Sequence, residues 1–206
     1  MSFTLNPSQS QSFEPCPAGV TPALCYRIID QGLQETAFGM KRRVLISWLT
    51  KHTRQDGEPF SVHQTATLSS HPQSTLVKML TNWRGKPLED GFQLGNVLGA
   101  PATILVEHND NDGTVFANVG TIMPGKKSDA PVCPSHIPLW SIEYPDRDGL
   151  RMAMDDLSDS LKGKVSDGWA KLDQAAAVKP VPVPMTAQEV ANQMVDDQLA
   201  DDEIPF

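Results

Sequence analysis

Basic and aromatic residues recur between Arg27 and Lys127, and together they could bind a strand of nucleic acid. Lysine and arginine side chains bind phosphate groups, and an aromatic ring that stacks on a base contributes about 1–3 kcal/mol per base. Phosphate contacts hold a strand without distinguishing its bases. The candidate residues for such a site are Arg27, Lys41, Arg42, Arg43, Trp48, Trp83, Arg84, Lys86, Phe116, Lys126 and Lys127.

The aromatic candidates also have a structural interpretation. Trp48 shares its strand parity with Val44 and Ile46, and Trp83 lies on the apolar face of a helical pattern. Base stacking and core packing therefore both stay open for the two tryptophans. Phe116 falls on the same face as Asn118, which favours exposure. The basic run Lys-Arg-Arg at 41–43, next to a strand that contains a tryptophan, favours phosphate contact over simple solvation.

The sequence lacks the residue patterns that are typical of enzymes. It contains no P-loop, no GxSxG and no HExxH. Asp110 and Asp112 fall in a predicted turn, and turn chemistry explains them better than metal binding. Cys133 and His136 have C-x-x-H spacing, but a tetrahedral zinc site would need two further ligands from scattered residues. We therefore expect no catalytic activity, no cofactor and no metal.

The net charge of −8 hides an uneven distribution. Residues 1–127 contain 11 Lys and Arg against 10 Asp and Glu, whereas residues 128–206 contain 6 against 15. A near-neutral body thus precedes an acidic tail. Apolar runs fall short of the roughly 20 residues of a membrane helix, and the polar N-terminus has no features of a secretion signal. These features predict a soluble, cytoplasmic protein, and three cysteines without CxxC spacing are expected to be reduced thiols.

Short apolar patterns predict five strands and one helix. Alternation of apolar and polar residues is clearest in the third strand. The helix is expected at residues 72–83, where apolar residues have helical spacing and Gly85 and Pro87 act as stop signals. A loop that contains Gly113 joins the last two strands in a hairpin. The predicted strands are residues 24–36, 41–50, 60–69, 103–108 and 114–123.

Three strands, one helix and two further strands follow each other in the element order of an OB-fold, a five-stranded barrel. We therefore predict a mainly β protein, in which a five-stranded OB-fold barrel has one helix between strands three and four. The predicted divisions are a flexible arm at 1–19, the OB-fold at 20–127, an acidic, proline-containing linker with short helices at 128–200, and a terminal segment at 201–206.

The last six residues are acidic residues followed by Ile-Pro-Phe. This string is similar to the C-terminal tip of bacterial single-stranded DNA-binding proteins. The resemblance implies that the tip docks replication and repair proteins, with the final ring in an apolar pocket and the terminal carboxylate beside a basic residue. The alternative is a solvated acidic tail. The residues assigned to docking are Asp201, Asp202, Glu203, Ile204, Pro205 and Phe206.

The body resembles phage-encoded single-stranded DNA-binding proteins of the OB type. The resemblance covers residues 18–127 and rests on the segments AGVTPALCYRIID, KRRVLISW, GEPFSVHQTATLSSHPQSTLVKMLTNWRGKPL and FANVGTIMP. It implies a protein in the bacterial host cytoplasm that binds and protects single-stranded DNA with little sequence specificity during DNA replication, recombination and repair. The alternative is an OB-fold adaptor that binds a protein or another ligand, because a fold does not fix a function.

Overall fold

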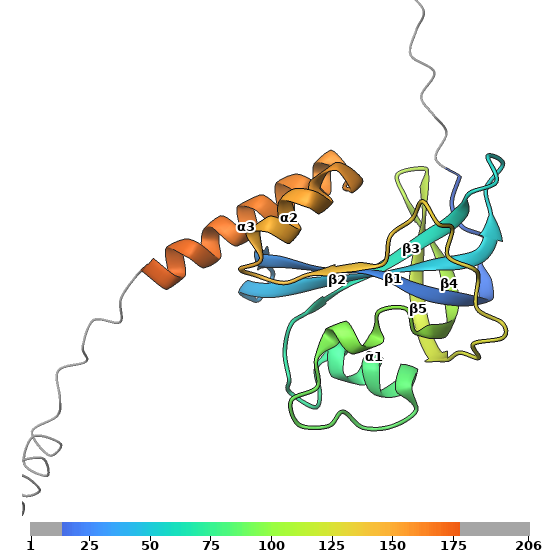
Figure 1. Ribbon diagram of the computed structural model, residues 1–206, viewed down its shortest axis with the longest axis horizontal. Coiled ribbons are helices and arrows are strands. Elements are labelled where there is room, and N and C mark those ends of the chain that lie inside the picture. Colours follow the sequence, from blue (N-terminus) through green and yellow to red (C-terminus); the bar gives the residue numbers. More distant parts are fainter. Residues whose placement is uncertain (1–13, 178–206) are drawn as a thin grey trace, which may run out of the picture. The chain divides into compact units, whose positions relative to one another are not determined.

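The computed structural model describes residues 14–177, which form a mainly β structure with a few helices (Figure 1). The mainly β class and the helix between the third and fourth strands are confirmed. The strands are β1 (Gly19–Thr36), β2 (Gly39–Thr53), β3 (Pro59–Thr67), β4 (Pro101–Asn111), β5 (Thr114–Pro124) and β6 (Trp140–Ile142). The helices are α1 (Thr75–Arg84), α2 (Arg147–Ala153) and α3 (Asp159–Ala177), with short 3-10 turns η1 (Leu94–Val97) and η2 (Met154–Asp156).

The strands form one sheet with the order β3-β2-β1-β4-β5, in which all neighbours are antiparallel. Residues 19–24 of β1 pair with β4, and residues 27–29 in the middle of β1 pair in parallel with the short strand β6. The outer strands β3 and β5 contact each other, but the sheet is not closed by a ladder between them. The coarse fold is therefore an antiparallel sheet with one parallel addition.

The first core lies between the sheet and α1. Ile28, Ile46, Trp48 and Val62 are buried on this face and pack with Trp83 of α1. The helix starts where the Ser74 side chain accepts a hydrogen bond from the N–H of Val77, which satisfies one of the free donors of the first turn. It ends at Gly85, whose φ of 66° is the left-handed conformation typical of a helix end.

A second core covers the opposite face of the sheet. Ile29 of β1 and Leu45 of β2 alternate with Ile28 and Ile46, so they point away from the first core. They pack against β6, α2, η2 and α3, and the members of this cluster are Ile29, Leu45, Ile142, Leu150, Ala153, Leu157, Val165 and Trp169. Figure 1 shows α1 on one side of the sheet and α2 and α3 on the other.

This second core differs from the expectation of a linker with short helices at 128–200. The helices exist, but they pack on the sheet, and the compact unit continues to Leu172. Of the second unit, the structure describes only residues 173–177. The predicted arm at 1–19 also differs in part, because Cys16 is buried and β1 begins at Gly19. Residues 1–13 and 178–206, including the tip at 201–206, lie outside the described residues.

The side chain of Asp30 joins the two faces of the structure. It is 3% exposed, and its Oδ1 accepts the N–H of Gly32 at 2.9 Å. Its Oδ2 accepts the Nε–H of Arg42 at 2.9 Å and the N–H of Tyr144 at 3.2 Å, and it also pairs with Arg42 Nη2. The main-chain oxygen of Asp30 accepts the indole N–H of Trp169 at 2.7 Å. One residue of β1 therefore bonds to β2, to the segment after β6 and to α3.

Helix α3 approaches β1 at two glycines. Gly32 has a φ of 67° at a register shift in β1, and a Cβ there would overlap the backbone of Gly168. A Cβ at Gly168 would in turn overlap the main-chain oxygen of Gln31. The close approach places Trp169 fully inside the second core and lets the amide of Gln34 donate to the main-chain oxygen of Lys164 at 2.7 Å.

We expect Gly168→Ala to lower the free energy of unfolding by about 1–3 kcal/mol, because the added methyl group overpacks the contact between α3 and β1. The matched control is Gly163→Ala, in the same helix, where a Cβ meets nothing within 4 Å. This control should raise the stability by up to about 1 kcal/mol through helix propensity. Urea unfolding followed by tryptophan fluorescence measures both changes. Equal stability of the two variants would contradict the docking of α3.

Candidate nucleic-acid interface

An open groove of about 760 Å³ lies on the face of the sheet that carries the second core, beside the cover formed by α3. We call it the Arg27 groove. Leu45 and Leu49 of β2 line it together with Ser61, His63 and Thr65 of β3. Its walls come from the start of α3, the segment before β6, residues 116–118 near the start of β5 and the β2–β3 turn, so segments far apart in the chain enclose one site.

One row of side chains crosses the sheet at this groove. Trp140 of β6 pairs with Arg27 of β1, Arg27 pairs with Ser47 of β2, and Ser47 pairs with His63 of β3. Residues directly opposite each other on neighbouring strands point to the same face. The row therefore places an indole ring, a guanidinium group and an imidazole ring along one line, with the buried Ser47 between the last two.

The guanidinium group of Arg27 lies against two aromatic rings. Its Cζ atom is 5.1 Å from the ring centre of Tyr26 and 5.6 Å from that of Trp140. The hydroxyl group of Tyr26 is hydrogen-bonded to Ser61 Oγ at 2.9 Å, which fixes this ring on the strand. A cation between aromatic faces has few accessible orientations, so Arg27 offers a preorganised positive charge.

The charges that line the groove are mixed. Arg27, Arg54 and Lys164 are cationic, and Glu14 and Glu58 are anionic. Glu58 lies 2.9 Å from His136 Nε2, and Arg54 forms an exposed ion pair with Asp56 at 3.2 Å. At the centre of the groove, partial burial and the positive charges of Arg27 and Lys164 lower the pKa of His63. Burial is the largest cause of this lowering, and the two nearby positive charges add to it.

Two of the residues predicted from the sequence line this groove, Arg27 and Phe116. Phe116 lies on β5 and is 45% exposed, as the parity argument indicated. Its ring is accessible to a ligand. Tyr26, Phe60 and Trp140 also line the groove, but Tyr26 and Phe60 are buried, so Phe116 and Trp140 are the rings with exposed surface.

The structure places Trp48 and Trp83 elsewhere, in the first core. Trp48 is 0% exposed and Trp83 is 3% exposed, and the two rings meet edge to face with their centres 5.6 Å apart. The indole N–H of Trp83 donates to the main-chain oxygen of Pro101 at 2.8 Å. Neither ring has a free face for a base, so we correct their assignment from base stacking to core packing.

The basic run 41–43 does not act as one patch. Arg42 is bonded to Asp30, and this contact and the nearby carboxylate of Glu143 raise its pKa. Arg43 is half-buried and donates to the main-chain oxygen of Thr65 at 3.3 Å. Lys41 is exposed near the start of β2. Arg42 therefore has a structural role, and none of the three residues lines the Arg27 groove.

The remaining predicted cations lie outside the groove. Arg84 ends α1, stacks on Phe92 with 4.4 Å between its Cζ atom and the ring centre, and pairs with Glu89 at 3.6 Å. Lys86 pairs with Glu89 at 2.8 Å. Lys126 and Lys127 are exposed after β5. The structure does not bring these four residues to Arg27.

Most groove residues were absent from the sequence-based selection, and five of them matter for the charge and the rings of the site. They are Tyr26, Arg54, His63, Trp140 and Lys164. Tyr26 lies at the register shift between Cys25 and Arg27 in β1, which brings the sequence neighbours Tyr26 and Arg27 to one groove. Trp140 and Lys164 come from the segment interpreted as linker, and their position depends on the pairing of β6 with β1 and on the docking of α3. For His63, the alternation in β3 was the one available signal. It places His63 on the face of the sheet opposite to that of the core residue Val62.

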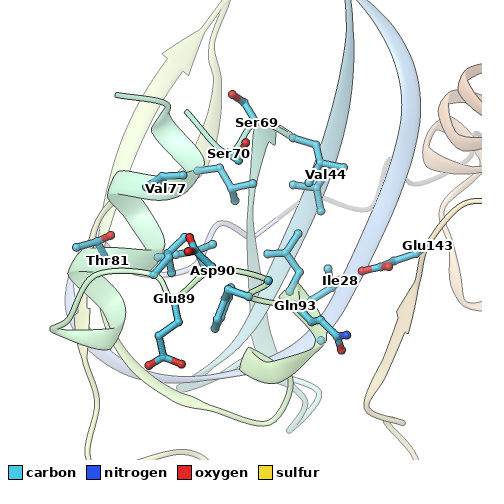
Figure 2. Close-up of a pocket in the computed structure, with 18 of the residues that line it drawn as sticks. Ile28, Val44, Ser69, Ser70, Val77, Thr81, Glu89, Asp90, Gln93 and Glu143 are labelled. Carbon is cyan, nitrogen blue, oxygen red and sulfur yellow. The ribbon is translucent and has the colours of Figure 1, made fainter. Parts of the chain in front are cut away.

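A second cavity of about 1130 Å³ lies between α1, the loop after it and the sheet (Figure 2). Val77 and Thr81 of α1 line it, with Ile28 and Val44 on the sheet side. The ionisable residues around this α1 cavity are Asp30, Arg42, Glu89, Asp90 and Glu143. The α1 cavity is therefore mainly apolar and rimmed by carboxylates, which disfavours a polyanion.

Other types of site are not supported within residues 14–177. In that range no group of three or more His, Cys, Asp or Glu side chains could hold a metal ion. Cys133 donates to the main-chain oxygen of Ile137 at 3.2 Å, and burial raises the pKa of Cys25 to about 12. None of the helices described for this part of the chain has the length and apolar character needed to cross a membrane.

No protein-family model matches the chain, and a search of curated proteins finds no significant match.

The Arg27 groove holds the most accessible of the four tryptophans. Trp48, Trp83 and Trp169 are buried, whereas Trp140 is partly exposed. We expect acrylamide to quench Trp140 and to leave the other three largely unaffected. Trp140→Phe should remove the quenchable fraction of the fluorescence, and Trp83→Phe should leave it. If Trp140→Phe kept the quenchable fraction, the ring would not line the groove as described.

Proposed function

We propose that the protein binds single-stranded DNA in the Arg27 groove, with little preference for sequence. The observation that carries the proposal is the row Trp140–Arg27–Ser47–His63 on a face where Tyr26 and Phe116 also lie. Single-strand binding needs cations for the backbone and aromatic faces for the bases, and this groove supplies both within one site. Arginine and lysine form strong charge-assisted hydrogen bonds with phosphate, and phosphate contacts hold a strand without distinguishing its bases, so we infer that these cations bind the backbone.

The strand order supports an OB-fold. In a five-stranded OB barrel, β1 pairs with β2 and β4, β2 with β3, and β4 with β5. The sheet here has these four pairings, and its outer strands β3 and β5 contact each other. We propose that the sheet is an OB-fold barrel that is open between β3 and β5. Ligands of OB-folds bind on the face of strands two and three and against the loop between strands four and five, and the Arg27 groove includes residues of β2, β3 and β5.

We further propose that the terminal segment recruits replication and repair proteins to the coated strand. Asp201, Asp202 and Glu203 would meet basic residues of the partner, and Ile204, Pro205 and Phe206 would fill an apolar pocket. This role rests on the sequence of these residues, which lie outside the described part of the chain. An aromatic residue in a buried pocket commonly contributes 2 kcal/mol or more to binding, about thirtyfold in affinity.

The α1 cavity favours a second function. Its apolar lining and its rim of carboxylates suit an apolar or cationic ligand, as expected for an adaptor that binds a protein or a small molecule. An adaptor of this kind would not need the cations of the Arg27 groove. Salt dependence separates the two functions. For single-strand binding, a plot of log affinity against log salt concentration falls with a slope of about 0.7 for each phosphate that is neutralised. An adaptor that does not use these cations lacks this dependence.

We expect Arg27→Gln to weaken binding of single-stranded oligonucleotides by about tenfold, as the loss of one charged contact of roughly 1.4 kcal/mol implies. The matched control is Lys86→Gln, which removes the same charge from an exposed ion pair away from the groove. Fluorescence anisotropy with single-stranded and duplex oligonucleotides at several salt concentrations measures both variants. Equal weakening would show a general charge effect and would contradict a site at Arg27. Failure of the parent protein to bind any single-stranded oligonucleotide would contradict the proposed function itself.

We expect Phe206→Ala to leave the affinity for single-stranded DNA unchanged and to abolish recruitment of replication and repair proteins. Its ring is assigned to the partner and not to DNA. In the experiment, immobilised single strands are coated with the parent protein or with the variant. The proteins that they retain from a bacterial extract are then identified. Asn192→Ala, in the same C-terminal region, is the control and should recruit like the parent. Recovery of the same proteins with Phe206→Ala would contradict the docking role.

A further inference from the structure

We propose that Arg27, His63 and Lys164 form a phosphate-binding subsite within the Arg27 groove, and that a phosphate group enters this subsite together with a proton on His63. The inference deepens the proposed function and rests on it, since the phosphate would belong to a bound DNA strand. It assigns a ligand contact to Lys164, which belongs to α3 and not to the five-stranded sheet.

Three separate elements bring these side chains together. Arg27 and His63 lie on the same face of β1 and β3, on either side of Ser47. Lys164 reaches the groove from α3, whose backbone is fixed there by the hydrogen bond from Gln34 to the main-chain oxygen of Lys164 at 2.7 Å. The side chains of all three residues line the groove.

The charges that act on His63 are both positive. Arg27 and Lys164 disfavour the protonated imidazole, and together with partial burial they lower its pKa below the usual value of 6.5. Two cations and a third group that can become cationic suit a ligand with a compact negative charge and several oxygen acceptors, which describes a phosphate group. The carboxylate of Glu58 also lines the groove, and its Oε2 atom lies 2.9 Å from His136 Nε2.

The linkage between phosphate and proton has a definite sign. In the empty groove, His63 is mainly neutral at neutral pH because its pKa is lowered. A bound phosphate would offset the charges of Arg27 and Lys164 and would favour protonated His63, so the pKa of His63 would rise on binding. Binding then takes up a proton, and the affinity must increase as the pH falls through the range in which His63 titrates.

Other ionisable groups in the groove could also respond to pH. They are Glu14, Arg54, Glu58 and His136, besides Arg27 and Lys164 themselves. Among these residue types, only histidine has an ordinary pKa between about 5 and 8, and His136 is the other histidine that lines the groove. His136→Gln is therefore the control for the role assigned to His63.

The test measures the affinity for oligo-dT between about pH 5 and 8, where the probe itself does not titrate. The full-length parent should bind more tightly at the lower pH, by up to about tenfold for each unit by which binding raises the pKa of His63. His63→Gln should remove most of this dependence, and His136→Gln should keep it. Lys164→Gln should weaken binding severalfold and reduce the salt slope by about 0.7. Lys162→Gln is the matched control, because Lys162 lies in the same helix but pairs with Asp159 and does not line the groove.

The imidazole resonances of His63 provide a second readout, which separates the subsite from the proposed function. If oligo-dT binds but the pH dependence is the same in His63→Gln, the inference is overturned while the proposed function stands. If oligo-dT does not bind at all, the proposed function fails, and titration with inorganic phosphate then tests the subsite alone. A rise in the pKa of His63 with phosphate that is lost in Lys164→Gln would support the subsite, and an unchanged pKa would overturn it.

Discussion

The buried carboxylate of Asp30 is the interaction on which the two faces of the structure depend. Its oxygens accept hydrogen bonds from Gly32, Arg42 and Tyr144, and its main-chain oxygen accepts one from Trp169. A buried charge is tolerated when such partners satisfy it, and loss of one partner typically costs about 3–5 kcal/mol. Asp30 therefore holds β2, the segment after β6 and α3 at fixed positions on β1, at a register shift where Gly32 allows α3 to approach.

The position of α3 in turn shapes the Arg27 groove. Because α3 docks on the outer face of the sheet and β6 pairs with β1, Lys164 and Trp140 reach a row of side chains that already contains Arg27 and His63. Without these two elements the groove would keep Arg27 and His63 on the sheet and Arg54 in the β2–β3 turn. With them it gains a third cation, Lys164, and a second accessible ring, Trp140, beside Phe116. The proposed function and the stability therefore depend on the same helix contact.

The sequence predicted the local elements better than the groove. Each predicted strand overlaps an observed strand, and α1 begins three residues after and ends one residue after its expected bounds, because alternation, helical spacing and glycine signals act over short distances. The second core was missed because β1 and β2 carry apolar residues on both faces, as at Ile28 and Ile29, and no local pattern shows what covers the second face. Arg42 was misassigned because its partner, Asp30, lies on another strand. The positions of Trp140 and Lys164 depend on contacts with residues that are distant in sequence, the pairing of Trp140 with Arg27 and the hydrogen bond from Gln34 to Lys164.

The most direct measurement of the central claim is to locate a bound strand on the protein. Ultraviolet crosslinking of the full-length protein to oligo-dT, followed by mass spectrometry of the crosslinked peptides, identifies the aromatic residues in contact with bases. The account predicts crosslinks at Trp140 or Phe116, which line the Arg27 groove with exposed surface. Crosslinks confined to Phe92 and its neighbours at the α1 cavity would place the strand on the other side of the sheet and would contradict the account.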